Sequence, residues 1–247
     1  MKEYTLPNGK KVFHNNDRET EFLYEEIFLD KVYTSCGIKL KKDSVVLDVG
    51  ANIGLFSVFV LENFSESKVY SFEPSPQIFK ILKSNVSPYE GRCKTFKTGI
   101  SDVEGEEEFL FYPDYSTFST FYPDKMNTDK DRMENVVDAK TAERALIPVK
   151  EKCSLLTLSH IIKSEKIDHI DLLKMDVQRA ELNVLKGIEK DDWVKIKQIS
   201  FELHHIGEEE TKEIETLLSE KGYRVVKEKD KLFTPEVPVY MVYAFRT

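Results

Sequence analysis

The chain has little of what builds disulfide frameworks, zinc knuckles or membrane spans. Its 247 residues include three cysteines, which stand far apart at Cys36, Cys93 and Cys153 and form no C-x-x-C pair. This usage indicates reduced thiols rather than cross-links or metal ligands. No apolar run approaches the roughly 20 residues that cross a bilayer, and the N-terminus shows no basic segment followed by an apolar one. We therefore expect a soluble, cytoplasmic protein without a membrane partner.

Positive charge is also scarce. Lys and Arg number 36 against 44 Asp and Glu, which gives a formal net charge of −8. Such a chain repels a phosphate backbone, and no cluster of basic and aromatic residues opposes this locally, so nucleic acid is not an expected partner. The hydrophobic residues, 40% of the total, are sufficient for the core of one large α/β domain spanning residues 1–247.

Strands and helices alternate along most of the sequence. The segments "VVLDV", "KVYSFEP", "CKTFKTGIS", "HIDLLKMD" and "IKQISFELHH" have the character of buried strands, and helical patterns such as "SPQIFKILKSNV" separate them. This alternation predicts parallel crossovers and a doubly wound sheet. Near the C-terminus "YRVVKEK" and "VYMVYAF" follow one another without a helix, which predicts an antiparallel pair at one edge.

Two segments stand outside this alternation. Residues 1–42 form a lead-in, where a Pro-Asn-Gly turn between two strand-like runs precedes the amphipathic pattern "ETEFLYEEIFLDKVY", so we expect a hairpin followed by a helix. Residues 113–150 are polar and aromatic by turns and are longer than an ordinary connection. Because they fall on the side of the sheet where ligands bind, we interpret them as a lid that contacts substrate. A solvated surface excursion is the alternative.

The motif "DVGANIG" marks the expected ligand site. A buried strand passes through Asp48 and is followed by Gly50, Asn52 and Gly54. This spacing has one glycine fewer in its turn than the dinucleotide motif G-x-G-x-x-G. The next strand ends in Glu73, about twenty residues further on, where a carboxylate accepts hydrogen bonds from both hydroxyls of a ribose and disfavours a 2′-phosphate.

The third strand end adds a group that can read adenine. Ser101 and Asp102 follow "CKTFKTGI", where a carboxylate and neighbouring amides can bind the amino edge of the base. The three strand ends together describe an adenosine site without a phosphate cradle. Such a cofactor is S-adenosylmethionine, whose methionine part we expect over Asp48, Gly50 and Asn52. An NAD-dependent oxidoreductase is a weaker alternative, because it needs a third glycine and a Tyr-x-x-x-Lys pair or its equivalent.

The chain resembles the FkbM-type S-adenosylmethionine-dependent methyltransferases through the ordered pieces "LDVGANIGLFS", "FEPSP", "GISDVEGEEEF", "IDLLKMDVQRAELNVLKGI" and "ISFELHH". The resemblance implies a seven-stranded Rossmann-like methyltransferase sheet and cofactor contacts at Pro74 and Asp176. It also implies O-methylation of a small-molecule hydroxyl. The opening of the chain is most similar to members embedded as domains in modular polyketide and nonribosomal peptide synthetases, which implies an intermediate delivered on a carrier protein. A sugar acceptor is the alternative.

The turn after the fourth strand departs from the family pattern D-x-E-G-x-E. It reads Asp176, Val177, Gln178, Arg179, Ala180, Glu181. Gln178 keeps the size of a glutamate but loses its charge, and Arg179 stands where glycine is commoner. This departure keeps open a third function, a non-catalytic binding module with a degenerate cofactor site.

His204 is the expected general base for the acceptor's proton. It stands at the carboxyl end of the fifth strand in "SFELHH", and a neutral imidazole titrates near the working pH and needs a partner to fix its tautomer. Glu202 points to the same side of the strand, and Asp176 ends the adjacent strand, so either carboxylate can orient the ring. We expect a reaction without a metal, with a magnesium ion on these three side chains as the alternative.

Overall fold

A seven-stranded sheet forms the centre of the computed structural model. The structure describes residues 1–247 except 124–129, 131–132, 135–137, 205–206, 230–238 and 247. The strands of this sheet are β3 (Val45–Val49), β4 (Lys68–Phe72), β5 (Cys93–Phe96), β9 (Leu172–Met175), β10 (Gln198–Leu203), β11 (Tyr223–Lys229) and β12 (Tyr240–Arg246). Their order across the sheet is β11-β12-β10-β9-β3-β4-β5.

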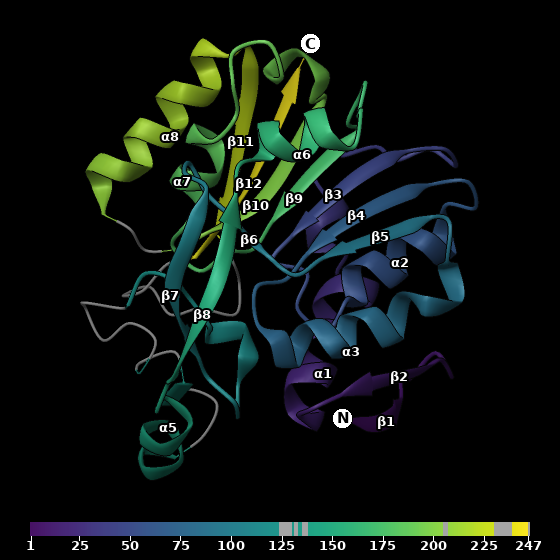
Figure 1. Ribbon diagram of the computed structural model, residues 1–247, viewed down its shortest axis with the longest axis vertical. Coiled ribbons are helices and arrows are strands. Elements are labelled where there is room, and N and C mark those ends of the chain that lie inside the picture. Colours follow the sequence, from purple (N-terminus) through teal and green to yellow (C-terminus); the bar gives the residue numbers. More distant parts are fainter. Residues whose placement is uncertain (124–129, 131–132, 135–137, 205–206, 230–238, 247) are drawn as a thin grey trace.

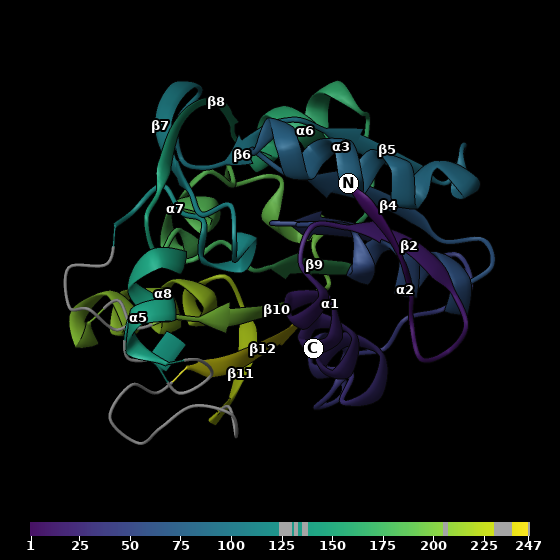
Figure 2. The same cartoon turned by 90° about the horizontal axis from the view of Figure 1, so that it is seen from below.

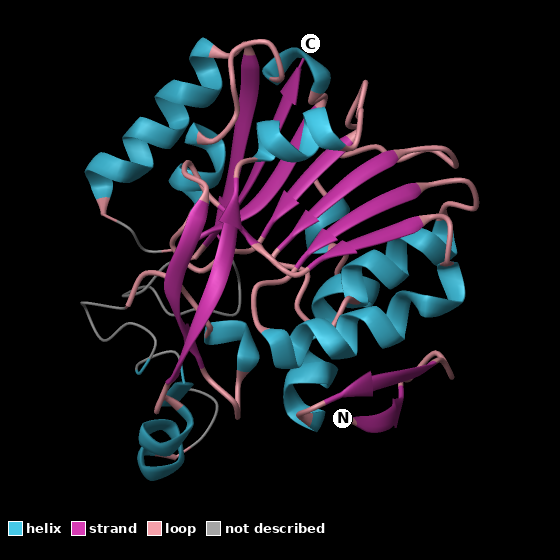
Figure 3. Ribbon diagram, in the orientation of Figure 1, coloured by secondary structure: helices cyan, strands magenta, loops and turns pink. Residues whose placement is uncertain are grey.

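Most of these strands run parallel to one another. Strands β5, β4, β3, β9 and β10 form parallel pairs, and β12 runs antiparallel between β10 and β11 (Figures 1 and 3). The register places Val49 beside both Phe72 and Met175, so the carboxyl ends of three strands meet at one edge. This confirms the predicted doubly wound, mostly parallel sheet with an antiparallel C-terminal strand.

Helices cover both faces of the sheet (Figures 1 and 2). The longer helices are α1 (Asp17–Tyr24), α2 (Leu55–Asn63), α3 (Pro76–Val86), α6 (Leu158–Ser164), α7 (Glu181–Lys186) and α8 (Glu208–Glu220), with shorter helical turns at Glu25–Leu29, Val32–Thr34, Ser87–Tyr89 and Trp193–Lys195. One core cluster joins α1, α2 and α3 to Val46 and Val69, and a second joins α6, α7 and α8 to Leu47 and Leu173. Because both faces are covered, β3 and β9 are buried along their whole length.

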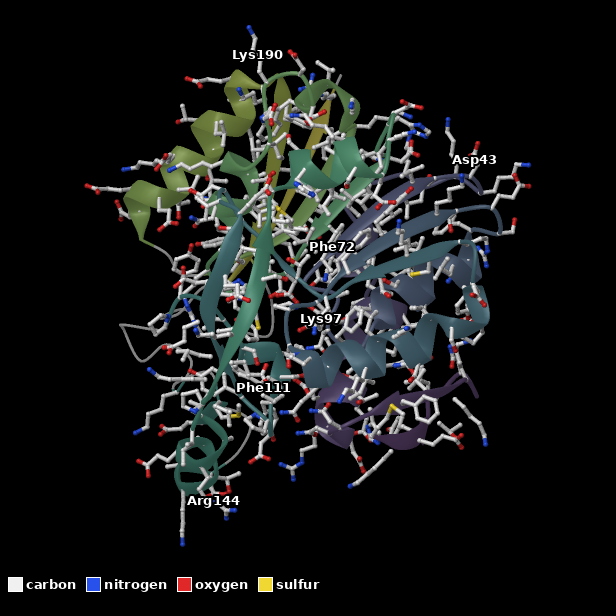
Figure 4. The ribbon with its side chains drawn as sticks, viewed as in Figure 1. Asp43, Phe72, Lys97, Phe111, Arg144 and Lys190 are labelled. Carbon is white, nitrogen blue, oxygen red and sulfur yellow. The ribbon has the colours of Figure 1, made fainter. Side chains whose placement is uncertain are left out.

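The chain leaves this sheet after β5 and builds a second sheet. Strands β6 (Gly99–Ile100), β7 (Gly105–Phe111) and β8 (Val149–Leu156) lie in the order β6-β8-β7, and the β7–β8 pair extends away from the main sheet (Figure 1). Lys97, labelled in Figure 4, marks the crossing between the two sheets. The segment "CKTFKTGIS" is therefore two short strands rather than the predicted one. Strand β8 escapes the sequence analysis because its charged stretch hides the buried alternation of Cys153 and Leu155.

The lead-in and the insertion meet beside the glycine turn. Strands β1 (Lys2–Thr5) and β2 (Lys11–His14) form the predicted hairpin before α1. The described part of the insertion includes a helical turn at Ser116–Phe118 and α5 (Ala139–Ala145), which lies beyond the far end of β7 and β8 (Figure 1). The Ser116 hydroxyl donates to Glu19 of α1 and accepts a hydrogen bond from the Asn52 amide. No helix within the described ranges is long and apolar enough to span a membrane.

Glu19 gives the fold a testable dependence on pH. Burial raises the pKa of its carboxyl from 4.5 to about 7, although hydrogen bonds from Thr117 and Ser116 lower it. Since the folded-state pKa lies above the unfolded one, the unfolding free energy falls as pH rises from about 4.5 to about 7, by at most about 3 kcal/mol. We expect Glu19→Gln to reduce the fall in unfolding free energy between pH 4.5 and pH 8, measured by urea unfolding, by about this amount, while the other buried carboxyls keep their share of it.

The exposed Glu25, which lies one and a half turns further along the same helical segment, supplies the control. Glu25→Gln should keep the slope of the unmodified protein, because its carboxyl is solvated in both the folded and the unfolded chain. A Glu19→Gln protein with an unchanged slope would contradict the assignment of the pH dependence to this carboxyl.

Candidate active site

The glycine turn after β3 lies directly against the end of β9. At Gly50, whose φ is +72°, a Cβ atom would stand 1.8 Å from the carbonyl oxygen of Asp176, so glycine alone fits there. The Gly50 carbonyl accepts a hydrogen bond of 2.9 Å from Lys174 Nζ. Backbone contact and a buried lysine thereby hold the two strand ends together.

The N–H groups of this turn are engaged within the protein. Those of residues 50 and 51 both donate to the Phe72 carbonyl, and that of residue 52 donates to the Glu73 side chain. Those of residues 53 and 54 donate to the Asn52 side chain and the Ala51 carbonyl. A pyrophosphate is held by N–H groups that point at the ligand, and none of these five is available for that purpose. Residues 50–54 therefore offer no N–H group to a pyrophosphate.

Asp48 faces the core rather than a ligand. Its Oδ1 lies 3.1 Å from Lys174 Nζ, and its Oδ2 accepts a hydrogen bond of 2.6 Å from the Ser57 hydroxyl. Burial lowers the pKa of Lys174, but Asp48 and Asp176 outweigh burial and raise it, so the lysine stays charged. This differs from the expected place of Asp48 under the methionine part of a cofactor. The side chain points to the α2 face of the sheet, where it anchors the lysine.

Glu73 stands at the end of β4, where the sequence predicts a ribose-binding carboxylate. Its two oxygens accept hydrogen bonds from the N–H groups of Asn52 (3.0 Å) and Ser75 (2.9 Å). Burial raises the pKa of the Glu73 carboxyl to about 8, while these N–H groups and Lys174 lower it. Both oxygens are fixed by backbone, so the carboxyl is held in one orientation before any ligand arrives.

A cleft runs along the carboxyl ends of β3, β4 and β9, the edge at which parallel α/β sheets bind their ligands. Phe72, labelled near the centre of the molecule in Figure 4, is one of its lining residues. Of the predicted cofactor residues, those that line it are Gly50, Asn52, Glu73, Pro74 and Asp176. The insertion adds Ser116 and Phe121 to the wall, so it borders the space as the predicted lid would.

Three other predicted cofactor residues are not among the described residues that line the cleft. Gly54, with a φ of +86°, precedes α2 and faces Leu82 of α3, where a Cβ atom would come within 2.6 Å of the leucine. Ser101 donates to Asp102 at 3.0 Å, and Asp102 also accepts from Asn183 of α7 at 3.1 Å. Because the chain turns into the second sheet at β6, the cleft wall at this strand end is made by the residues just before Ser101.

Asp176, Glu202 and His204 come together at the ends of β9 and β10. One ligand atom from each lies within 4.8 Å of the others. The Tyr33 hydroxyl donates to Glu202 at 2.8 Å and lies 3.3 Å from Asp176. Burial and the nearby Glu202 raise the pKa of Asp176 to about 6, although Lys174 lowers it. Of the three, Asp176 belongs to the cleft wall, and the other two lie buried behind it.

Glu181 is the partner of His204 that the sequence analysis does not assign. Its Oε1 lies 2.7 Å from His204 Nδ1, and both side chains are buried. Burial lowers the pKa of His204, but Glu181 and Glu202 together raise it to about 9. The two carboxylates thereby favour the imidazolium form of the ring, whereas the sequence predicts a neutral base. In the sequence, Glu181 is the last acidic residue of the turn after β9, and nothing in that pattern indicates a contact with His204.

Gln178 and Arg179, which depart from the family pattern D-x-E-G-x-E, have an unusual backbone conformation. Gln178 and Arg179 have φ values of +46° and +76°, the left-handed region that glycine adopts without strain. The insertion holds this loop, because Thr120 donates to the Gln178 carbonyl at 2.6 Å and Arg179 Nε donates to the Tyr122 carbonyl at 3.1 Å. The Gln178 amide donates to Asp176 Oδ1 at 3.2 Å, so the uncharged side chain stays in the site.

The sheet order, the glycine turn and the cleft at the carboxyl ends of the parallel strands are those of the Rossmann-like methyltransferase fold. Residues 48–225 match the family model described as the methyltransferase FkbM domain. The chain belongs to the FkbM methyltransferase family.

Known proteins resemble the chain over different extents. It is 35% identical over 252 residues to 31-O-demethyl-FK506 methyltransferase FkbM from Streptomyces tacrolimicus, covering 98% of this chain and 96% of the relative. It is 38% identical over 223 residues to the AMB antimetabolite synthetase AmbE from Pseudomonas aeruginosa, covering 82% of this chain and only 10% of that synthetase. The crystal structure of methyltransferase FkbM from Methylobacillus flagellatus superposes with a TM-score of 0.58 at 14% identity, covering 89% of this chain and 47% of that one.

The contact at Gly50 predicts a large loss of stability on substitution. Gly50→Ala combines a left-handed φ with a Cβ atom inside contact distance of Asp176, so we expect the unfolding free energy to fall by more than about 3 kcal/mol. Gly91 has a φ of +88°, but a Cβ atom there would meet no other atom within 4 Å, so Gly91→Ala should cost only about 1 kcal/mol. Urea unfolding of both variants separates the effect of the contact with Asp176 from the effect of the left-handed backbone. Equal losses of unfolding free energy in the two variants would show that the contact with Asp176 does not matter.

Proposed function

We propose that this protein transfers a methyl group from S-adenosylmethionine to a hydroxyl of a polyketide or nonribosomal-peptide intermediate. The observation that carries the proposal is the composition of the cleft wall. It combines an immobilised carboxyl at Glu73, a turn without available N–H groups and an acidic cluster that begins at Asp176. A ligand with a ribose and a positive charge, but without phosphates, fits all three features.

The described residues divide the binding of such a ligand between them. Glu73 is placed to accept hydrogen bonds from the ribose hydroxyls, and Gly50 and Asn52 border the same space. The carboxylates of Asp176 and Glu202 favour a cation at the other end of the cleft. When bound, S-adenosylmethionine supplies the methyl group on a sulfonium, and the protein's part is then to align the acceptor and to receive its proton.

The cluster of Asp176, Glu202 and His204 is placed to receive the proton of the acceptor. Asp176 is the member of the cluster that lines the cleft, and Glu202 and His204 lie behind it. Glu181 and Tyr33 fix the other members through hydrogen bonds of 2.7 Å and 2.8 Å. We therefore assign proton acceptance to the cluster through Asp176, and a positioning role to His204 and Glu202.

The acceptor class is supported by the relatives rather than by the cleft. The name of the Streptomyces tacrolimicus relative specifies transfer to an oxygen, and the Pseudomonas aeruginosa relative is a synthetase of which the matched part is a tenth. We take the oxygen acceptor from the first name, and we infer delivery on a carrier protein from the match to part of a synthetase. Residues of the insertion line the cleft, and we propose that they contact that acceptor.

Calorimetric titration tests the donor. We expect the protein to bind S-adenosylmethionine and its demethylated product with dissociation constants on the order of micromolar, and not to bind NAD. Glu73→Ala should weaken both by about tenfold or more, because the ribose hydroxyls lose a buried hydrogen-bond partner that is fixed in one orientation. Glu66→Ala, at an exposed position before the opposite end of β4, is the matched control. Absence of binding would favour the non-catalytic module, and binding of NAD would favour an oxidoreductase.

Turnover tests the acceptor. With S-adenosylmethionine and a β-hydroxyacyl group on a carrier protein, we expect an O-methylated product by mass spectrometry. Asp176→Asn should lower kcat by about 10² to 10⁴, whereas Asp168→Asn, exposed before the opposite end of β9, should leave it unchanged. Methylation of amines alone, at a rate that Asp176→Asn does not alter, is the result that the proposal could not accommodate.

A further inference from the structure

The cluster behind the cleft wall contains more acidic than basic side chains. Asp176, Glu181 and Glu202 all lie around His204. The neighbouring Lys174 already forms an ion pair of its own at 3.1 Å. Buried charges of one sign need a counter-charge close to them, so the cluster has the composition of a cation site.

The imidazole of His204 is oriented as metal-binding histidines are. Its Nδ1 bonds to Glu181, which turns Nε2 toward Glu202 Oε2 at 3.4 Å. Within the described part of the chain Nε2 makes this long contact to Glu202 but no hydrogen bond of regular geometry, and His204 is only 1% exposed. A carboxylate that holds one ring nitrogen while the other nitrogen faces a metal is a common outer-shell arrangement. Tyr33 plays the same part for Glu202 by binding its other oxygen.

Gln178 supplies an independent observation. Its side chain is 5% exposed, and its Oε1 has no hydrogen-bond partner among the described residues. The amide nitrogen of the same group lies 3.2 Å from Asp176 Oδ1. A half-turn of the terminal amide exchanges these two atoms, which would bring a neutral oxygen ligand beside the carboxylate.

We propose that Asp176, Glu202 and His204, together with Gln178 Oε1, bind a divalent cation such as Mn²⁺ or Mg²⁺, which displaces the proton from His204 Nε2 into solution. Ligand atoms around a cation with bonds of about 2.1 Å stand about 3.0 to 4.2 Å apart, and the three side chains already offer atoms within 4.8 Å of one another. Oxygen ligands suit both ions, and the imidazole favours Mn²⁺. This revises the expectation of a metal-free reaction.

The role of the cation rests on the proposed function. Because Asp176 lines the cleft, a cation bound to it stands beside the acceptor. A metal ion in that place lowers the pKa of a coordinated hydroxyl and orients it, which is the task assigned above to the cluster. The binding of the metal itself does not require a cofactor or an acceptor.

Manganese binding to the full chain tests the site. After treatment with a chelator and removal of the chelator, the protein is titrated with Mn²⁺ alone, and the free ion is followed by electron paramagnetic resonance. We expect one bound Mn²⁺ per chain, with spin-echo modulation from a directly coordinated imidazole nitrogen. This spectroscopic readout uses the unmodified protein, so it does not depend on whether a variant folds. No bound Mn²⁺, or binding without nitrogen modulation, overturns the proposal.

Variants locate the site. His204→Asn and Glu202→Gln should weaken Mn²⁺ binding by about tenfold or more. His160 is the control, because it is an exposed histidine that also lies 3.0 Å from a carboxylate, that of Glu104. An equal loss in His160→Asn overturns the assignment.

Binding of S-adenosylmethionine is measured on the same preparation. Normal cofactor binding without any Mn²⁺ binding overturns the metal site and leaves the methyl-transfer proposal standing, with the sulfonium as the counter-charge. Stoichiometric Mn²⁺ binding with nitrogen modulation, but without cofactor binding, supports the site and removes the proposed function.

Discussion

The approach of the Gly50 turn to the backbone of Asp176 is the constraint on which the site depends. At this point the ends of β3 and β9 are too close for any side chain, and Lys174 closes the contact by donating to the Gly50 carbonyl. The lysine in turn is held by Asp48. The turn therefore cannot move without losing its hydrogen bond to a lysine that a buried ion pair holds in place. Removal of one partner of such a pair typically costs about 3–5 kcal/mol. This rigidity gives the cleft a fixed wall.

The same constraint explains how the acidic groups are distributed. With Asp48 committed to Lys174 inside the sheet, the carboxyls left at the cleft edge are Glu73 at one end and Asp176 at the other. Glu73 is fixed by backbone N–H groups and takes no part in the cluster. Asp176 opens into a group of carboxylates around His204. The cleft thus presents a hydrogen-bond acceptor at one end and a cation-attracting cluster at the other.

The sequence predicts those site residues correctly whose place depends only on the end of a parallel strand. Glu73 and Asp176 lie on the cleft wall because parallel strands bring their carboxyl ends to one edge, whatever the helices do. Prediction from the sequence fails where the chain changes sheets. Asp102 contacts Asn183, and Ser101 contacts Asp102, because β6 belongs to the second sheet. No local sequence pattern predicts that the chain passes from one sheet to the other.

Partnerships between elements far apart in the chain are equally hidden from the sequence. The bond between Glu181 and His204 joins residues 23 positions apart. Together with Glu202 it favours a charged imidazolium where the sequence predicts a neutral ring. The most direct test of the account is a crystal structure of the protein with S-adenosylhomocysteine. We expect the ribose hydroxyls of S-adenosylhomocysteine to form hydrogen bonds with the Glu73 carboxyl group, and its sulfur to lie at the Asp176 end of the cleft. A ligand bound elsewhere, or bound in this cleft without contact to Glu73, would contradict it.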